Sequence, residues 1–333
     1  AFAELDVIAF VQGQTRACVC VLHYSGGTLQ DKEYTFFHVT ESDPAEVLSS
    51  FIKQYYAQRN AVAKTVLLSH EIEEQDAVGE YLSSIAERKV ELAVPQRGER
   101  RVLTRLAEKN AFEEIERREK QSERRHKSLE LLQNVTGMAA LPLRLEAYDI
   151  SNFAGQDTVG SMIVFVEGQP KKSDYRKFKI RTVQGPNDYA SMEEVLTRRF
   201  SHGIQESENL REKGKDISYG SFTRFPDLIM MDGGRGQVNI ALAVLDRLGL
   251  SIPVCGMVKD DNHRTRGLYY NNVEIPIDRD SEGFKLITRV QDEAHRFAIE
   301  YHRSLRSKDQ VHSILDDIDG IGPARRKALM RHF

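Results

Sequence analysis

The stretch LRLEAYDISNF, residues 143–153, is the first indication of the fold. In it an apolar run with alternating side chains ends at an aspartate, Asp149. Such alternation is typical of a strand. A second apolar run, FPDLIMMDGG at residues 225–234, ends in the same way at Asp232, directly before two glycines. An acid at the end of an apolar run is costly to bury unless it binds a metal ion or a hydrogen-bond donor. The two runs therefore predict two strands that each deliver an acid to a sheet.

Outward from these runs, the chain repeats a simple order of elements: three strands, helix, strand, helix, strand, helix. The predicted elements lie at 143–153, 161–168, 174–183, 188–203, 225–234, 237–250, 252–260 and 284–306. This is the order of the ribonuclease-H-like fold, an α/β fold with a mixed sheet flanked by helices. In that fold the first and fourth strands are neighbours, so Asp149 and Asp232 are expected to meet. The fold alone does not establish an activity.

The first 95 residues show the same order, which predicts two such domains in tandem. Strands are predicted at 6–11, 15–24, 32–39, 64–69 and 90–95, and helices at 44–58 and 76–88. Identity between the halves is negligible, so two unrelated α/β domains are the alternative. Counted from the glycine turns, Asp6 corresponds to Asp149, whereas Ser69 stands where Asp232 would be. We expect the first copy to be degenerate and to act as a scaffold.

Two further segments complete the organisation. Residues 97–130 carry alternating charges and no proline, which predicts a long exposed helix. The C-terminal sequence LDDIDGIGPARRKALMRHF, residues 315–333, indicates a helix-hairpin-helix of which only the first hairpin is present; an αα turn is the alternative. The predicted domains are 1–96 (degenerate ribonuclease-H-like), 97–138 (connecting helix), 139–308 (ribonuclease-H-like) and 309–333 (helix-hairpin-helix).

Composition excludes several classes of protein. The 333 residues are 40% hydrophobic and 29% charged, the balance of a globular chain of two or three domains. No apolar run approaches the roughly 18 residues of a membrane span, and the N-terminus has no signal-peptide pattern. The absence of an initiator Met suggests a fragment of a longer protein. Three cysteines without a CxxC motif predict neither a disulfide framework nor a zinc or iron–sulfur site, and indicate a reducing cytoplasm.

Charge is unevenly distributed along the chain. The formal net charge is −3, but residues 1–95 contain 14 Asp and Glu against 7 Lys and Arg, a net of −7. The rest of the chain therefore carries +4, so we expect any anion to bind there.

Three residues are candidates for catalysis on their own pattern. Asp149 and Asp232 on neighbouring strands would form a hard oxygen site for Mg²⁺ or Mn²⁺. His295 lies in the last predicted helix, where it could ligate a metal or act as a base towards water, whereas Asp188 lies where a helix begins and by itself is expected to cap it. Such a set suits phosphodiester hydrolysis, with Asp149, Asp232 and His295 as metal ligands. The alternative is that the acids only cap helices and turns.

Several basic or glycine-rich positions are candidates for contact with DNA phosphates. The stretch KKSDYRKFKIRTV, residues 171–183, is either a phosphate-contacting strand or an edge strand protected by charge. The loop DGGRGQVN, residues 232–239, has no nucleotide-binding spacing, and its glycines are expected to allow a sharp turn beside the metal. The predicted DNA-contacting residues are Lys171, Lys172, Arg176, Lys179, Arg235, Gly320, Gly322, Arg325 and Arg326.

The motifs together resemble the C-terminal half of the UvrC family, the incision subunits of the bacterial nucleotide-excision-repair nuclease. The resemblance rests on AYDISNFAGQDTVGSMIVF, QPKKSDYRKFKI, GPNDYASMEEVLTRRF, PDLIMMDGGRGQVN, DEAHRFAIEYHRSLRSK and DDIDGIGPARRKAL. These stretches cover nearly all of residues 145–333, and VPQRGERRVLTRLAEKNA extends the likeness towards the N-terminus.

The resemblance implies a monomeric cytoplasmic endonuclease that acts on damaged double-stranded DNA and makes the incision 5′ to a lesion. It places the catalytic acids on Asp149, Asp188 and Asp232 and the histidine on His295. The family's other nuclease, its cysteine-rich stretch and its segment for contacting the UvrB–DNA complex have no counterpart here, so 3′ incision is not expected. A non-catalytic DNA-binding and assembly module is the alternative function, and a structure-specific RNA nuclease is a weaker one.

Overall fold

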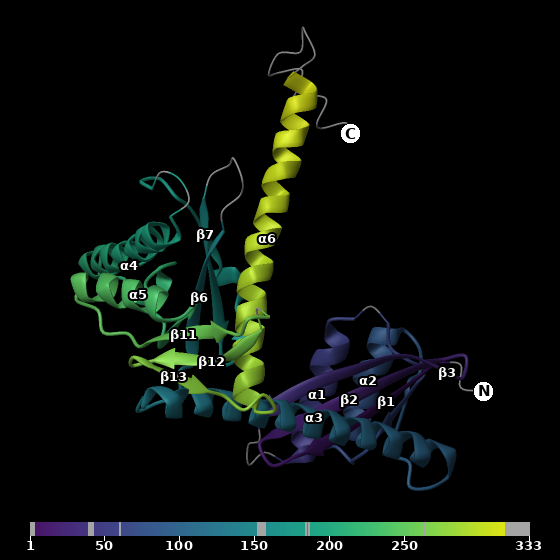
Figure 1. The fold of residues 1–333 in the computed structure, drawn as a ribbon. Coiled ribbons are helices and arrows are strands. Elements are labelled where there is room, and N and C mark those ends of the chain that lie inside the picture. Colours follow the sequence, from purple (N-terminus) through teal and green to yellow (C-terminus); the bar gives the residue numbers. More distant parts are fainter. Residues whose placement is uncertain are drawn as a thin grey trace. The chain divides into compact units, whose positions relative to one another are not determined.

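The structure, a computed structural model, divides the chain into two compact units, residues 1–123 and 124–333, each with its own sheet (Figure 1). It describes residues 4–38, 43–59, 61–151, 158–183, 185, 187–262 and 264–316, with the backbone alone for 301–316. The predicted helix-hairpin-helix, with Gly320, Gly322, Arg325 and Arg326, lies outside the described residues apart from the end of the last helix. No described helix is long and apolar enough to cross a membrane.

The first unit has a five-stranded mixed sheet in the order β3-β2-β1-β4-β5. Its first three strands are antiparallel, and β4 and β5 run parallel to β1. The strands are β1 (Glu4–Gln12), β2 (Arg16–Ser25), β3 (Thr28–His38), β4 (Thr65–Leu68) and β5 (Glu91–Ala93), and the helices are α1 (Pro44–Ala57), α2 (Gln75–Ala86) and the start of α3 (Gly98–Thr136). Strand alternation sends one set of side chains towards α1 and α2 and the other towards α3.

The second unit has an eight-stranded sheet in the order β13-β12-β11-β10-β6-β7-β8, with β9 paired to β7. Strands β10 and β11 run parallel to β6, and the other pairs are antiparallel. The strands are β6 (Arg144–Ser151), β7 (Val159–Val166), β8 (Gln169–Pro170), β9 (Arg176–Lys179), β10 (Leu228–Asp232), β11 (Val254–Lys259), β12 (Thr265–Tyr270) and β13 (Val273–Pro276). The helices are α4 (Asp188–Glu212), α5 (Arg235–Arg247) and α6 (Glu282–Asp316), with single 3₁₀ turns at Lys172–Asp174 and Ile217–Tyr219.

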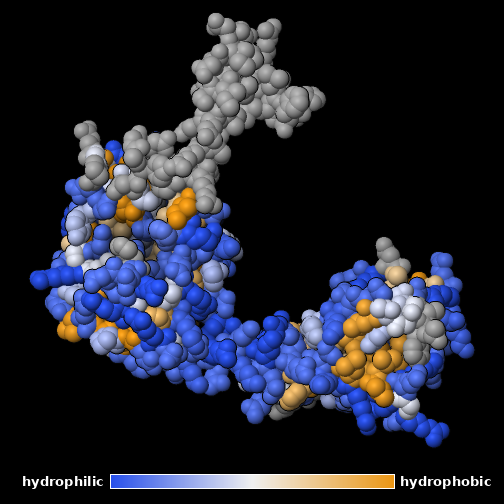
Figure 2. Space-filling model, turned by 45° about the vertical axis from the view of Figure 1, so that its right-hand side comes forward, coloured by the Kyte–Doolittle hydropathy of each residue, from blue (hydrophilic) through white to orange (hydrophobic). Residues whose placement is uncertain are grey.

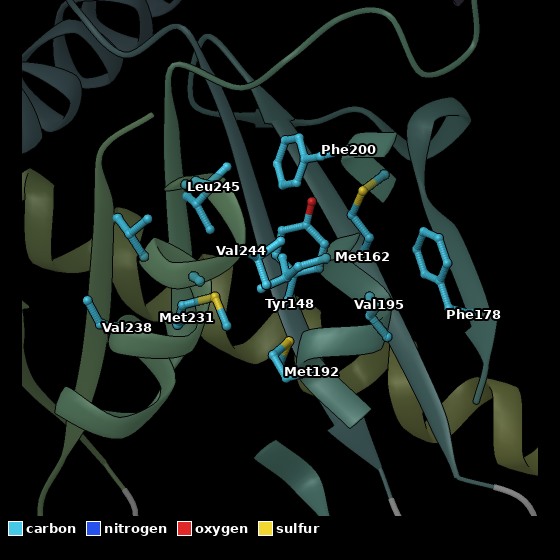
Figure 3. Packing of buried hydrophobic residues seen from close by; sticks show 14 of the residues in the cluster. Tyr148, Met162, Phe178, Met192, Val195, Phe200, Met231, Val238, Val244 and Leu245 are labelled. Carbon is cyan, nitrogen blue, oxygen red and sulfur yellow. The ribbon is translucent and has the colours of Figure 1, made fainter. Parts of the chain in front are cut away.

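Two apolar layers hold the second sheet between its helices. On one face, Tyr148 and Met231 pack against α4 and α5 (Figure 3). On the other face, Leu145 and Met230 pack against α6 and the end of α3. Because neighbours along a strand face opposite sides, the apolar runs around Asp149 and Asp232 fill both layers. The predicted α/β fold of mixed sheets flanked by helices is confirmed in both units.

Two predictions about individual elements are wrong. Helix α3 is not exposed all round, since Ala107, Ala111 and Ile115 are buried in one unit and Leu132 in the other. The charged residues between these positions concealed the apolar face of the helix in the sequence. The stretch KDDNHRTRGLYY, residues 259–270, follows a predicted strand and is therefore expected to be a loop, but Thr265–Tyr270 forms β12. The missed signal was the Asn271–Asn272 pair, whose positive φ angles of 50° and 63° suit a two-residue hairpin between β12 and β13.

Candidate active site

The two aspartates singled out by the sequence lie side by side at the carboxyl ends of neighbouring parallel strands. Tyr148 of β6 pairs with Met231 of β10, so the next residue of each strand is Asp149 or Asp232. The predicted adjacency of these strands is confirmed. Open α/β sheets bind ligands at the carboxyl ends of their parallel strands, which makes this edge the place to look for a site.

The aspartates influence one another electrostatically. Burial, and after it the nearby carboxylate of Asp232, raise the pKa of Asp149 to about 7. The carboxylate of Asp188, the first residue of α4, also raises the pKa of Asp149, whereas the ammonium group of Lys259 lowers it. Asp149 therefore lies within electrostatic range of the other two predicted catalytic acids, which come from separate segments.

Helix capping does not explain these acids. The N-cap of α4 is Asn187, whose side chain accepts a hydrogen bond from the backbone N–H of Ala190 at 3.1 Å. The N-cap of α5 is Gly234, and no side chain caps that helix. Asp232 therefore lies before the cap position.

Two residues that the sequence analysis missed hold Asp232. The ammonium of Lys259, the last residue of β11, donates to Oδ2 at 2.8 Å. The side-chain amide of Gln291 on α6 donates to Oδ1 at 2.8 Å, and Thr265 donates to the amide oxygen of Gln291. A signal existed for Lys259, because it ends the apolar strand at the same edge of the sheet. Nothing in the sequence marked Gln291, whose role depends on the approach of α6.

His295 lies one helical turn after Gln291 on α6 and lines the same cleft beside Asp232 as Lys259. Among the described residues, no three His, Cys, Asp or Glu side chains are gathered as a group that could hold a metal ion. The set of Asp149, Asp232 and His295 therefore stays a prediction as a complete set of ligands.

The turn after Asp232 depends on two glycines. Gly233 has a φ of 140°, a conformation that side chains rarely adopt. Its carbonyl oxygen passes close over β11, where a Cβ on Gly256 would come within 2.2 Å of it. The sharp turn expected from the DGGRGQVN sequence is present, and it leaves Arg235 exposed at the start of α5.

The basic stretch 171–183 is divided between a 3₁₀ turn and the short strand β9. Lys171, Lys172 and Lys179 are exposed, whereas the guanidinium of Arg176 donates to the backbone carbonyls of Ser173 and Tyr175 at 2.9 and 2.8 Å. Arg176 thus stabilises its own turn. A DNA-contacting role for all four, and for Arg235, stays a prediction.

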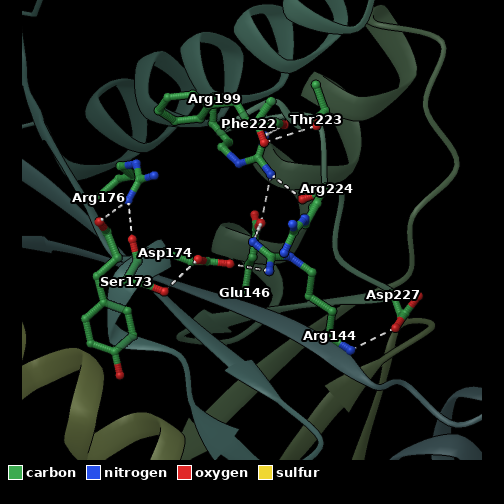
Figure 4. Close-up of polar contacts among 12 residues, drawn as sticks. Arg144, Glu146, Ser173, Asp174, Arg176, Arg199, Phe222, Thr223, Arg224 and Asp227 are labelled. Atoms are coloured by element: carbon green, nitrogen blue, oxygen red, sulfur yellow. Dashed lines mark hydrogen bonds and ion pairs between the residues drawn. The ribbon is translucent and has the colours of Figure 1, made fainter. Parts of the chain in front are cut away.

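A buried polar network lies beneath the acids on β6 (Figure 4). Glu146, fully buried, accepts hydrogen bonds from Arg199 of α4 at 2.8 Å and from the hydroxyl of Tyr148 at 2.6 Å. Arg199 also donates to the carbonyls of Phe222 and Arg224, at 2.7 and 2.9 Å. Since buried charges need partners, this network fixes α4 against β6, three residues before Asp149. The acid inside an apolar strand was the visible signal for it.

The first unit has no such acids at the equivalent edge. Ile8 of β1 pairs with Leu68 of β4, as Tyr148 pairs with Met231, so the equivalents of Asp149 and Asp232 are Ala9 and Ser69. The expected correspondence of Asp6 with Asp149 is therefore wrong. Counting to the glycine turns failed because the loop between β6 and β7 is longer than the hairpin between β1 and β2.

By register, Asp6 instead corresponds to Glu146. It is buried, it accepts a hydrogen bond from the hydroxyl of Tyr56 on α1, and its other oxygen lies 2.5 Å from Nδ1 of His23. Each unit therefore joins a buried acid of its first strand to the helix that follows the meander. Ser69 uses its hydroxyl to accept the N–H of Phe10 at 3.0 Å.

Family models and curated relatives agree with this tandem arrangement. The model described as "UvrC RNAse H endonuclease domain" matches residues 133–299, and the one described as "UvrC Ribonuclease H-like domain" matches residues 4–118. The two matches confirm the prediction of two ribonuclease-H-like domains in tandem.

The curated relatives carry the name "UvrABC system protein C". Those from Lachnospira eligens, Clostridium perfringens and Alkaliphilus metalliredigens are 53%, 47% and 46% identical over 98–99% of this chain. The chain spans 54% of the length of each. Among solved structures, Ciona intestinalis endonuclease V with DNA covers 45% of this chain and 59% of its own, at 13% identity and a TM-score of 0.25, too weak a likeness to bear on function. On the family models and these relatives, the chain belongs to the UvrC family.

Proposed function

We propose that the second unit is a metal-dependent DNA endonuclease that makes the incision 5′ to a lesion in nucleotide excision repair. The observation that carries the proposal is the meeting of Asp149 and Asp232 at the ends of neighbouring parallel strands. The name of the curated relatives, UvrABC system protein C, supports the setting. Damaged double-stranded DNA is the proposed substrate, and a UvrB–DNA complex is the proposed partner of the full-length protein.

The residues at this edge fit a divalent cation such as Mg²⁺ or Mn²⁺. Asp149 and Asp232 supply hard oxygen donors. The raised pKa of Asp149 reflects its burial first and then the negative charge of Asp232, which a cation would balance. When bound there, the ion would polarise the scissile phosphate and lower the pKa of a water molecule.

The surrounding side chains have separate roles in this proposal. Lys259 and Gln291 orient the carboxylate of Asp232 from opposite sides, so that its oxygens face fixed directions. Asp188 adds a third carboxylate beside Asp149. His295 takes the proton from the attacking water or ligates the ion. The first unit, with Ala9 and Ser69 at the equivalent positions, acts as a scaffold.

The test is nicking of a duplex that carries one bulky lesion and an end label. The parent chain should cut 5′ to the lesion with Mg²⁺ or Mn²⁺ and should lose this activity in EDTA. Asp232→Asn should be slower by roughly 100-fold or more, because several kcal/mol of metal-assisted stabilisation of the transition state are lost. Asp246→Asn, at an exposed aspartate of α5, is the matched control and should cut like the parent.

Cleavage by Asp232→Asn at the parent rate would overturn the catalytic assignment in favour of a non-catalytic DNA-binding module. Cuts on the 3′ side alone would contradict the proposed polarity. An equal rate on a matched RNA duplex would overturn the assignment of DNA as the substrate.

A further inference from the structure

A cleft of about 570 Å³ opens beside Asp232, between the loop that joins β11 to β12 and the first turns of α6. Lys259 and Gln291, which hold Asp232, form part of its lining, and His295 lies on the same wall. A space of this volume is in the range that encloses a small ligand or a segment of a larger one.

Positive charge gathers in this cleft from three separate segments. Lys259 ends β11, Arg264 lies in the loop that follows, and Arg279 comes from the turn before α6. Lys259 is already paired with Asp232, which leaves the two exposed arginines as the outer cations. Asp292 is the one acid among the described residues that line the cleft.

A carboxylate outside the lining organises both arginines. Asp260 accepts hydrogen bonds from the backbone N–H groups of Arg264 and Asn262, each at 2.9 Å, which lowers the pKa of Asp260 and ties these two backbone groups to one carboxylate. The guanidinium of Arg279 lies 3.8 Å from the same carboxylate. The arginines are thus placed by the loop in advance, which reduces the entropy lost when an anion binds.

We propose that this cleft binds the backbone of the DNA strand that is cut, at the phosphate next to the scissile one. Arg264 and Arg279 contact that phosphate. Because two lining residues, Lys259 and Gln291, contact Asp232, a phosphate held in the cleft sets the register of the strand on the catalytic acids. The proposal rests on the proposed endonuclease function and names the substrate contacts of that site.

The first test measures binding of lesion-bearing duplex by fluorescence anisotropy, with Ca²⁺ in place of Mg²⁺, over a series of salt concentrations. The double variant Arg264→Ala/Arg279→Ala should bind about 10-fold or more weakly. Its slope of log affinity against log salt should be smaller by about 1, the value expected for one phosphate contact. Arg266→Ala is the matched control, because Arg266 lies on β12, pairs with Glu274 at 2.6 Å and does not line the cleft.

The second test locates the phosphate, using duplexes in which one phosphate at a time is replaced by a neutral methylphosphonate. The parent should lose affinity when the replacement falls next to the cut position. The double variant should show no additional loss at that position and the usual loss at the others. A site for a free anion is distinguished by thermal unfolding together with DNA binding. If inorganic phosphate protects the parent but not the double variant, while both bind the duplex with the same affinity, the DNA subsite is overturned.

The proposal is also overturned if the double variant binds with the affinity and salt slope of the Arg266→Ala control. Nicking is measured in parallel. If the parent chain fails to nick, the endonuclease function itself is contradicted. If the parent nicks and the arginine variants bind DNA with normal affinity, only the assignment of the cleft is contradicted.

Discussion

At the scale of single residues, the site combines groups that the sequence displays with groups that it hides. Asp149 and Asp232 were visible because acids seldom end apolar strands without a function. Lys259 has only the weaker mark of ending an apolar strand at the same edge of the sheet, and Gln291 has none, since a glutamine on a helix is an ordinary surface residue. Only the contacts at 2.8 Å to Asp232 show their role.

Asp149 should make stability depend on pH in an unusual direction. Its pKa is raised from 3.8 to about 7, so folding favours the protonated form. The stability this contributes is present below about pH 4 and is lost as the pH rises through about 7. In metal-free buffer, Asp149→Asn should therefore be more stable than the parent at pH 8, by about 1–2 kcal/mol after allowance for partial solvation, and equal to it near pH 4.

Urea unfolding at several pH values, with Asp246→Asn as the exposed control, measures this difference. Addition of Mg²⁺ should stabilise the parent more than Asp149→Asn, because only the parent offers the full pair of carboxylates. If Asp149→Asn is less stable than the parent at pH 8, the carboxylate is held by favourable contacts, and the predicted excess of negative charge is wrong.

At the scale of elements, β6 is the central support of the site, and its position depends on a buried ion pair. Both side chains of the pair are almost wholly inaccessible, at 0% for Glu146 and 1% for Arg199. A charge buried at this depth is tolerated only while its partner remains. The exposed side of the same helix carries an ordinary pair, Glu193 with Arg247 of α5, at 2.7 Å.

We expect Arg199→Met to destabilise the second unit by about 3–5 kcal/mol, because Glu146 then lacks its main partner. Arg247→Met removes an exposed pair and should cost less than about 1 kcal/mol. The double variant Arg199→Met/Glu146→Met should be more stable than Arg199→Met alone. Chemical denaturation of the four proteins measures these values, and similar losses for Arg199→Met and Arg247→Met would show that burial does not matter here.

At the scale of the whole molecule, the two units share a fold but differ in the residues at the ends of their neighbouring parallel strands. Figure 2 shows mainly hydrophilic side chains on the face of the second unit turned towards the viewer, with apolar ones in small groups. In both units a buried acid of the first strand pairs with the following helix, at Asp6 and Glu146. The acids at the strand ends occur in the second unit alone, where the first has Ala9 and Ser69.

This difference predicts opposite effects for two aspartates. Asp6→Ala removes the partner of Tyr56 and His23 and should destabilise the first unit by about 2–3 kcal/mol, with no direct effect on nicking. Asp232→Asn should leave the first unit intact and abolish nicking. Hydrogen exchange of the β1 and β6 amides, measured beside the nicking rate, separates the two. A loss of nicking in Asp6→Ala while β6 stays protected would give the first unit a role beyond that of a scaffold.

The sequence by itself determined the order of the elements and the pair of acids, because strand alternation and apolar runs are local properties of the chain. It also indicated that the first unit lacks one of the acids. It could not fix the register between distant strands, so Asp6 was matched to Asp149 rather than to Glu146. Only the tertiary structure decided which side chains from β11, the following loop and α6 meet at Asp232, because these contacts depend on how separate elements pack.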